Sequence, residues 1–304
     1  MYLEHYKNRL ENIPSFLEKY LNVPSIKRLK GIGYFCGMDF ASKDIYNFPE
    51  YISRFDHSLT VALMIYKLTG DKKATLAGLF HDIATPCFSH VIDYMNGDFK
   101  NQESTEEYTE KIILGDKELL SCLEEDNIDV SDIIDFKKYS VVDLDRPCLC
   151  SDRLDGIILT AMGWTKNISK DDIDVIVDSM RIYKNEDNLD EIGLSNENIV
   201  KRIIDINKVI DIYCHSNEDN YMMSLLADIT RLGISNNLFT YDDLYYMSED
   251  EIFNILNNCN IVEIKKLLNI FYSIKKSDIP NMQIPGIKVR KINPLCNGRR
   301  FYNV

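Results

Sequence analysis

Apolar residues recur at spacings of three and four along most of this 304-residue chain, while two-residue alternation is scarce. A spacing of three and four places apolar side chains on one face of an α-helix. The pattern therefore predicts an all-α fold. Helices are expected over residues 2–20, 57–68, 72–84, 102–114, 152–161, 168–188, 195–215, 219–232, 241–257 and 262–274.

Three serines stand where expected helices begin, at Ser169, Ser195 and Ser248. We expect them to be N-caps, because a serine hydroxyl can accept a hydrogen bond from a free amide of the first turn. Two stretches do not follow the helical pattern. Residues 32–41, rich in glycine and aromatics, predict a hairpin or a loop, and residues 284–295 are expected to end in a short strand, which leaves room for a β-hairpin or strand pair.

Composition and charge exclude several classes of protein. The chain is 45% hydrophobic and 27% charged, which is enough to bury a large core. Its net charge of −13 would repel a phosphate backbone, so general nucleic-acid binding is not expected. No apolar run approaches the roughly 20 residues that span a bilayer, so we expect no membrane association and a cytoplasmic protein.

Four residues that are distant in sequence share one chemistry: His57, His81, Asp82 and Asp152. Two imidazoles and two carboxylates can hold one divalent metal ion, and this donor set suits Mn, Fe, Zn, Ni, Co or Mg. Each residue alone has a simpler interpretation, since a single histidine is usually a core or surface residue and an aspartate is often a helix cap. Asp155, one helical turn later, competes with Asp152 for the role of ligand.

The sequence around these residues resembles a known family. His57 lies in the string Arg-Phe-Asp-His-Ser-Leu, and the doublet His81-Asp82 is followed by Pro-Cys-Phe-Ser-His, which ends at His90. The chain resembles the HD-domain metal-dependent phosphohydrolases, and most of all their deoxynucleoside triphosphate triphosphohydrolase branch. The resemblance implies an HD-domain helical fold with additional C-terminal helices, and it places the fourth ligand at Asp152, the acid followed by a basic residue.

The resemblance also implies a function. The expected substrate is a nucleotide, a (deoxy)nucleoside triphosphate cut to nucleoside and triphosphate, with Arg54 and Arg153 in contact with phosphate. His90, which ends the doublet motif, is also expected to lie near the ion and bind substrate phosphate, and the alternative is a histidine that only supports the site or the core. A nucleotidase or phosphodiesterase that acts on a mono-, cyclic or alarmone-type nucleotide is the first alternative. A nucleotide-binding regulator that kept the ion and lost turnover is the second. The family further implies a homo-oligomer, a dimer or higher.

Two departures from the family concern proton transfer. Thr85 and Gln102 stand where the resemblance leads one to expect histidines. Catalysis would therefore depend on Glu103, Glu106 or Asp155 as general acid or base, although acids at the start of the expected helix 102–114 also favour its N-terminal dipole. Where the family offers a tyrosine and a later acid, this chain has Gly156 and Thr160, which predicts a roomier or differently shaped sugar pocket.

The best domain boundary follows the last expected ligand helix. We expect a metal-binding phosphohydrolase core over residues 1–165 and a helical C-terminal extension, packed on the core, over residues 166–304. The extension ends in a basic segment that carries Lys288, Arg290, Lys291, Arg299 and Arg300. This segment could dock on the protein's own acidic surface, bind phosphate, or reach a neighbouring subunit.

Overall fold

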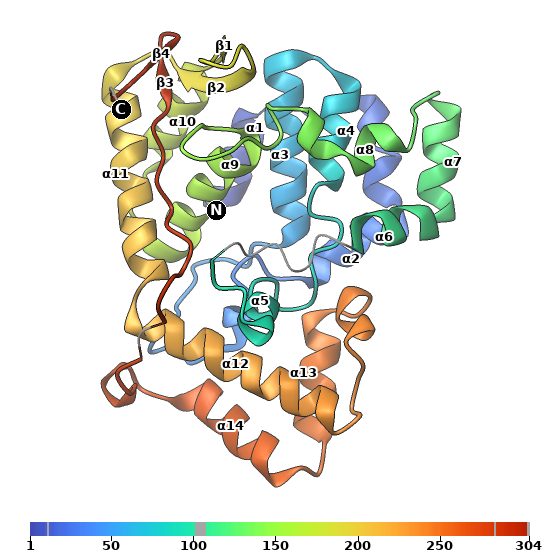
Figure 1. Ribbon diagram of the computed structural model, residues 1–304, viewed down its shortest axis with the longest axis vertical. Coiled ribbons are helices and arrows are strands. Elements are labelled where there is room, and N and C mark those ends of the chain that lie inside the picture. The colour runs from blue at the N-terminus through green and yellow to red at the C-terminus, as the bar shows by residue number, and fades with distance from the viewer. Residues whose placement is uncertain (11, 101–107, 283, 303–304) are drawn as a thin grey trace.

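The computed structural model describes residues 1–10, 12–100, 108–282 and 284–302, and within them the chain is mostly helical (Figure 1). The predicted fold class is confirmed, and a small four-stranded sheet accompanies the helices. The helices are α1 (Tyr2–Arg9), α2 (Pro24–Arg28), α3 (Arg54–Thr69), α4 (Lys72–Phe80), α5 (Val91–Asn96), α6 (Thr109–Gly115), α7 (Lys117–Glu125), α8 (Ser131–Ile134), α9 (Ser151–Thr160), α10 (Lys170–Ser179), α11 (Glu197–Cys214), α12 (Asn217–Ser235), α13 (Glu249–Asn258) and α14 (Val262–Ser273). The strands are β1 (Met180–Lys184), β2 (Asp190–Leu194), β3 (Leu295–Cys296) and β4 (Arg299–Arg300).

Helices α3 and α4 form the centre of the core. Both are buried nearly all round, because residues 59–65 and 76–80 are apolar or small with no polar face. The two helices pack closely at Gly78, where an added Cβ would collide with the side chain of Ile65. A glycine in the last turn of α4 thus lets the end of this helix approach α3, the helix that carries His57.

The sheet corrects the prediction of one helix over residues 168–188. Helix α10 ends at Ser179, and the short stretch Met-Arg-Ile-Tyr-Lys that follows is the strand β1. Strand β1 pairs antiparallel with β2, and β2 pairs in parallel with β3, so that Gly193 faces Leu295. The predicted C-terminal strand is confirmed by β3, which turns back into β4.

Helix ends were predicted with mixed success. Ser169 and Ser248 each form a capping box with the acid three residues later, as expected. Ser195 is not a cap, since Asn196 accepts the hydrogen bond at the start of α11. The expected helix over residues 2–20 ends at Arg9, ahead of the helix-breaking Pro14.

Other predicted boundaries also shift. The expected helix over residues 72–84 ends at Phe80, and the range 241–257 is split into a 3₁₀ turn and α13. The first half of the expected helix 102–114 lies outside the described residues. Residues 32–41 form turns, with one β-bridge from Gly33 to Ser53. No helix in the described part of the chain is both long and apolar enough to cross a membrane.

We call residues 284–294 the C-terminal segment. It runs beside α11, from the region of α5 and α12 to the sheet, and is drawn in dark red in Figure 1. Its end is fixed to the sheet by Arg300, whose guanidinium makes a bidentate ion pair with Glu191 over distances of 2.7 and 2.9 Å. Glu191 is fully buried, so this pair ties β4 to the interior of the protein.

Candidate metal centre

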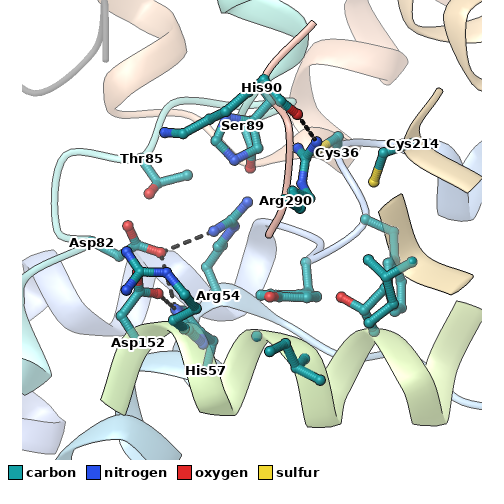
Figure 2. Close-up of a pocket in the computed structure, with 18 of the residues that line it drawn as sticks. Cys36, Arg54, His57, Asp82, Thr85, Ser89, His90, Asp152, Cys214 and Arg290 are labelled. Carbon is teal, nitrogen blue, oxygen red and sulfur yellow. Dashed lines mark hydrogen bonds and ion pairs between the residues drawn. The ribbon is translucent and has the colours of Figure 1, made fainter. Parts of the chain in front are cut away.

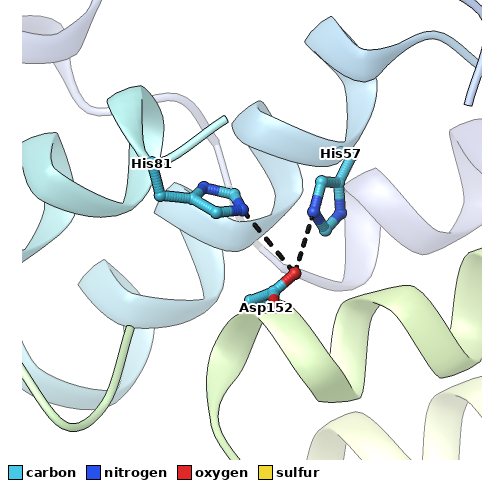
Figure 3. Close-up of side chains that lie close together, drawn as sticks. All are labelled: His57, His81 and Asp152. Carbon is cyan, nitrogen blue, oxygen red and sulfur yellow. Dashed lines mark hydrogen bonds and ion pairs between the residues drawn. The ribbon is translucent and has the colours of Figure 1, made fainter. Parts of the chain in front are cut away.

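Two histidines and one aspartate from three helical regions meet at one point (Figure 3). His57 comes from α3, His81 from the turn that ends α4, and Asp152 from the first turn of α9. The Nε2 atoms of His57 and His81 lie 3.1 and 3.6 Å from the same oxygen, Oδ1 of Asp152. One ligand atom from each residue falls within 4.8 Å of the other two, a compact group of metal-binding type.

The other nitrogen of each ring is engaged by an acceptor. Nδ1 of His57 lies 2.7 Å from Oδ2 of Asp155, and Nδ1 of His81 lies 2.7 Å from the carbonyl oxygen of Gly78. When Nδ1 donates its proton to these acceptors, the lone pair of Nε2 is free to bind an ion. Nε2 of His81 is buried and has no hydrogen-bond partner in the described structure. This donor set fits a divalent metal ion.

Asp82, the other half of the doublet, lies at the edge of the group. Its Oδ2 is 3.6 Å from Nε2 of His57, and its Oδ1 is 3.8 Å from Nε2 of His81. NH1 of Arg54 donates to the same Oδ2 over 2.9 Å, and this arginine also stacks on the ring of Tyr34. All four predicted ligands are therefore neighbours, with Asp82 shared between the group and Arg54.

Electrostatics in this group favours positive charge. Burial lowers the pKa of His57, but hydrogen bonds to Asp152 and Asp155 outweigh it and raise the pKa to about 10. Burial opposes ionisation of Asp82, yet the charges of His81, Arg54 and His57 lower its pKa to about 2. Because the carboxylates attract either protons or a cation, metal binding here would release protons from the imidazoles.

The group opens into a cavity of about 530 Å³, a size typical of small-molecule sites (Figure 2). Predicted residues that line it besides the ligands are Arg54, Thr85, His90, Arg153, Gly156 and Thr160. Later parts of the chain complete the walls, among them Asp219 of α12 and Arg290 of the C-terminal segment. Both halves of the predicted division at residues 165 and 166 thus contribute to one cavity, and the division itself stays a prediction.

Arg153 and His90 are held by local contacts. NH1 of Arg153 donates to the carbonyl oxygen of Cys148 over 2.5 Å, and its NH2 lies 3.7 Å from Oδ1 of Asp143. Nδ1 of His90 lies 2.9 Å from Oδ2 of Asp93, at the start of α5. Both side chains line the cavity, so the structure brings them to the predicted site.

Asp155, predicted as a general acid or base, does not lie in the cavity where proton transfer to a substrate would occur. It is fully buried, its Oδ2 is bonded to His57, and its Oδ1 accepts from the hydroxyl of Tyr6 over 2.7 Å. It lies behind His57 and is not among the cavity-lining residues, a placement that favours positioning of the imidazole over proton transfer. The other two predicted acids, Glu103 and Glu106, lie outside the described residues, as does Gln102.

Sequence reasoning missed several residues that shape the site. Tyr6 and Gly78 act through the histidines, and Arg28 donates to the carbonyl oxygens of Ile83 and Thr85, which fixes the turn after the doublet. The hydroxyl of Tyr34 lies 3.0 Å from where a Cβ on Gly156 would stand, so Tyr34 fills part of the room that was predicted there. No short motif identifies Tyr6, Arg28 or Tyr34, because each lies far along the chain from the group that it contacts. Gly78 is only three residues before His81, but it acts through its backbone carbonyl, which every residue type offers.

Comparison with known proteins agrees with this geometry. Residues 54–156 match the HD domain. The match begins at Arg54 and ends at Gly156, so it contains all four predicted ligands. It supports a metal-dependent hydrolase in general, and HD domains bind divalent metals.

One relative is similar over most of its length. The chain is 26% identical over 290 residues to the uncharacterized protein YdhJ of Bacillus subtilis (strain 168), which covers 93% of this chain and 84% of the relative. The similarity extends well beyond the HD match, so it also covers helices outside residues 54–156.

Proposed function

We propose that the protein is a metal-dependent phosphohydrolase that acts on nucleotides and cuts a (deoxy)nucleoside triphosphate to nucleoside and triphosphate. One observation carries the metal-dependent part. The Nε2 atoms of His57 and His81 both face Oδ1 of Asp152, while both Nδ1 atoms are bonded to acceptors behind them. The nucleotide part rests on the resemblance of the motifs to the triphosphohydrolases.

The residues around the proposed ion would have different roles in catalysis. A bound divalent ion would supply Lewis-acid chemistry and activate water. Asp155 and Gly78 hold the two imidazoles in the tautomer that presents Nε2. Arg54, paired with Asp82, and Arg153, at the cavity wall, would bind the phosphoryl oxygens and stabilise negative charge as it shifts during the reaction.

Proton transfer is the step with the fewest assigned residues. Thr85 lines the cavity, but its hydroxyl does not titrate near neutral pH. Glu103 and Glu106 remain the predicted acids and bases. His90 is also in the cavity wall, and its contact with Asp93 orients the ring there, which makes it a further candidate for proton transfer.

The metal centre is tested by removing the doublet. The variant with His81→Ala and Asp82→Ala should lose its bound metal, measured by elemental analysis of purified protein. A matched control replaces another histidine and aspartate pair, His5 and Asp174, which lie 2.7 Å apart at the surface. Metal content that is unchanged in the doublet variant would refute the centre.

The reaction is tested by a screen of nucleotides with Mn, Fe, Co, Ni, Mg and Zn, followed by product analysis. Release of inorganic triphosphate supports the proposal. Release of orthophosphate or pyrophosphate instead would identify the nucleotidase or phosphodiesterase. A folded, metal-loaded protein that releases no product would be the nucleotide-binding regulator.

A further inference from the structure

The C-terminal segment meets a loop of the HD domain at the cavity wall. This loop includes Arg146 and Pro147, just before α9. The amide of Asn293 donates to the carbonyl oxygen of Pro147 over 2.8 Å, and NH1 of Arg146 lies 3.4 Å from the carbonyl oxygen of Lys291. The loop and the C-terminal segment, which are 145 residues apart at this contact, therefore form one wall.

Arg290 is fixed in this wall through its backbone. Its amide donates to Oδ1 of Asp211 over 2.6 Å, and its carbonyl oxygen accepts from the side-chain amide of Asn207. Two side chains of α11 thus bind the backbone of Arg290. NH1 of Arg290 donates to the carbonyl oxygen of Lys288 over 3.1 Å. Figure 2 shows the side chain in the upper middle of the view, beside Cys36, with Asp82 and Asp152 at the lower left.

Arg146 differs from the other arginines of the site. Arg54 is paired with Asp82, and Arg153 lies near Asp143. In the described structure, Arg146 has no carboxylate partner, and this distinguishes it, since its Nε is buried without a hydrogen bond just as those of Arg54 and Arg153 are. Burial and the nearby charges of Arg153 and Arg290 lower its pKa to about 10, which indicates that the three guanidinium groups influence one another.

Arg153 and Arg290 have carboxylates beside them that raise their pKa despite burial, whereas Arg146 is left with the repulsion of these two cations. An anion next to Arg146 would relieve this repulsion. Guanidinium groups bind phosphate oxygens with two parallel hydrogen bonds, which makes arginine well suited to this anion. The cavity of about 530 Å³ has room for a ligand that extends from the metal centre along this wall.

We propose that Arg146 and Arg290 form an anion subsite beside the metal centre, and that it binds a phosphate group of the substrate other than the one at the metal. The proposal rests on the proposed function for the identity of the substrate. It favours substrates with two or more phosphate groups, such as the proposed triphosphate, over the monophosphate alternative. It also gives the C-terminal segment a role, because the subsite is complete only when this segment is docked.

The subsite is tested by binding, without turnover. Full-length protein depleted of metal is placed in equilibrium dialysis with inorganic tripolyphosphate or orthophosphate, and bound phosphate is quantified. Tripolyphosphate should bind more tightly than orthophosphate. Arg146→Gln and Arg290→Gln should each weaken tripolyphosphate binding about tenfold, because each removes a charge-assisted contact.

Arg299→Gln is the matched control, since this arginine is exposed on the same C-terminal stretch and does not line the cavity. Circular dichroism and thermal unfolding establish that each variant is folded. Affinity that is unchanged in both cavity variants, an equal loss in the control, or no binding by the parent protein would overturn the subsite.

The result is separable from the proposed function. Binding that depends on Arg146 and Arg290, in a protein that hydrolyses no nucleotide, would support the subsite and refute the hydrolase. Hydrolysis of a nucleotide, together with tripolyphosphate binding that is unchanged in both arginine variants, would support the hydrolase and refute the subsite.

Discussion

The two ends of the cavity are built in different ways. At the metal centre, side chains hold one another: Asp152 contacts both histidines, Asp155 holds His57, and Arg54 holds Asp82. At the C-terminal end, the cation Arg290 is held through its backbone by α11. The first end depends on contacts between its own charged groups, and the second depends on how the chain is anchored elsewhere.

This difference predicts which mutations should affect each end of the cavity. The metal centre should respond to changes at the residues behind the ligands and tolerate changes at the sheet. The C-terminal segment should respond to its anchor, since β3 and β4 connect to the rest of the protein through pairing with β2 and through Arg300. The two ends should therefore be separable by mutation.

The largest expected effect is on the anchor. Arg300→Ala leaves the buried carboxylate of Glu191 without its bidentate partner, and breaking a buried ion pair in this way costs about 3–5 kcal/mol. We expect the free energy of unfolding, measured by urea denaturation, to fall by about that amount. Tripolyphosphate binding should weaken while metal content stays unchanged.

The neighbouring Arg299→Ala is the control for this change, because Arg299 is exposed and should alter stability by no more than about 0.5 kcal/mol. Loss of metal from folded Arg300→Ala protein would break the comparison, since it would make the two ends one cooperative unit.

The next effect concerns pH at the C-terminal end. Asp219 lines the cavity and accepts a hydrogen bond from Tyr46 over 2.7 Å. Burial raises its pKa from 3.8 to about 7, against the opposing effects of Tyr46, Arg290 and His215. Between about pH 4 and pH 7 the folded protein therefore keeps a proton that the unfolded chain has lost, and stability contributed by this proton is lost as the pH rises.

Asp219→Asn removes this titration. We expect the variant to gain roughly 2–4 kcal/mol relative to the parent between pH 4 and pH 7, since one pKa unit corresponds to about 1.4 kcal/mol. Urea denaturation at steps of pH measures the difference. Asp228→Asn, exposed on the same helix, controls for the loss of a negative charge. A difference between Asp219→Asn and parent that is constant over this range would contradict the raised pKa.

The sequence predicted the metal centre better than the rest of the cavity, for a physical reason. His57, His81, Asp82 and Asp152 stand in short motifs whose local structure, helix starts and a turn, already limits where the side chains can lie. The serine caps at Ser169 and Ser248 could be predicted for the same reason, because an N-cap depends on residues within one helical turn.

What could not be predicted depends on contacts between distant residues. The strand Met180–Lys184 exists because it pairs with β2, which in turn pairs with β3, whereas the spacing of apolar residues favoured continuing the helix. Asp155 was expected at the reacting centre, and only the packing of Tyr6 from α1 shows that its carboxylate lies behind His57. Arg290 was recognised as basic, but its place in the cavity wall follows from α11.

A third prediction sharpens the metal end of the comparison. Asp155→Asn replaces an acceptor by a group that can also donate to Nδ1 of His57, which would move the proton to Nε2 and oppose metal binding. We expect metal affinity, measured by competition with a chelator, to fall about 10–100-fold. Tripolyphosphate binding to the metal-depleted protein should be unchanged.

Asp93→Asn is the matched control for Asp155→Asn. Asp93 is also buried and also contacts Nδ1 of a histidine, but that histidine, His90, is not a predicted ligand. Metal affinity should be the same as in the parent. Equal losses in the two variants would show that the effect comes from disturbed packing and not from the tautomer of His57.

The smallest effect is expected one step further from the ion, at Tyr6. Tyr6→Phe removes the hydroxyl that donates to Oδ1 of Asp155, so the carboxylate keeps His57 but is less firmly fixed. We expect a loss of about 1 kcal/mol in stability and a fall in metal affinity of only a few fold, smaller than in Asp155→Asn. Tyr20→Phe is a close control, because Tyr20 is equally buried and donates to Asp126, far along the chain from the predicted ligands. Tyr20→Phe should lose similar stability with no change in metal affinity. An equal fall in metal affinity in both variants would mean that metal binding follows global stability, and not the series of hydrogen bonds from Tyr6 through Asp155 to His57.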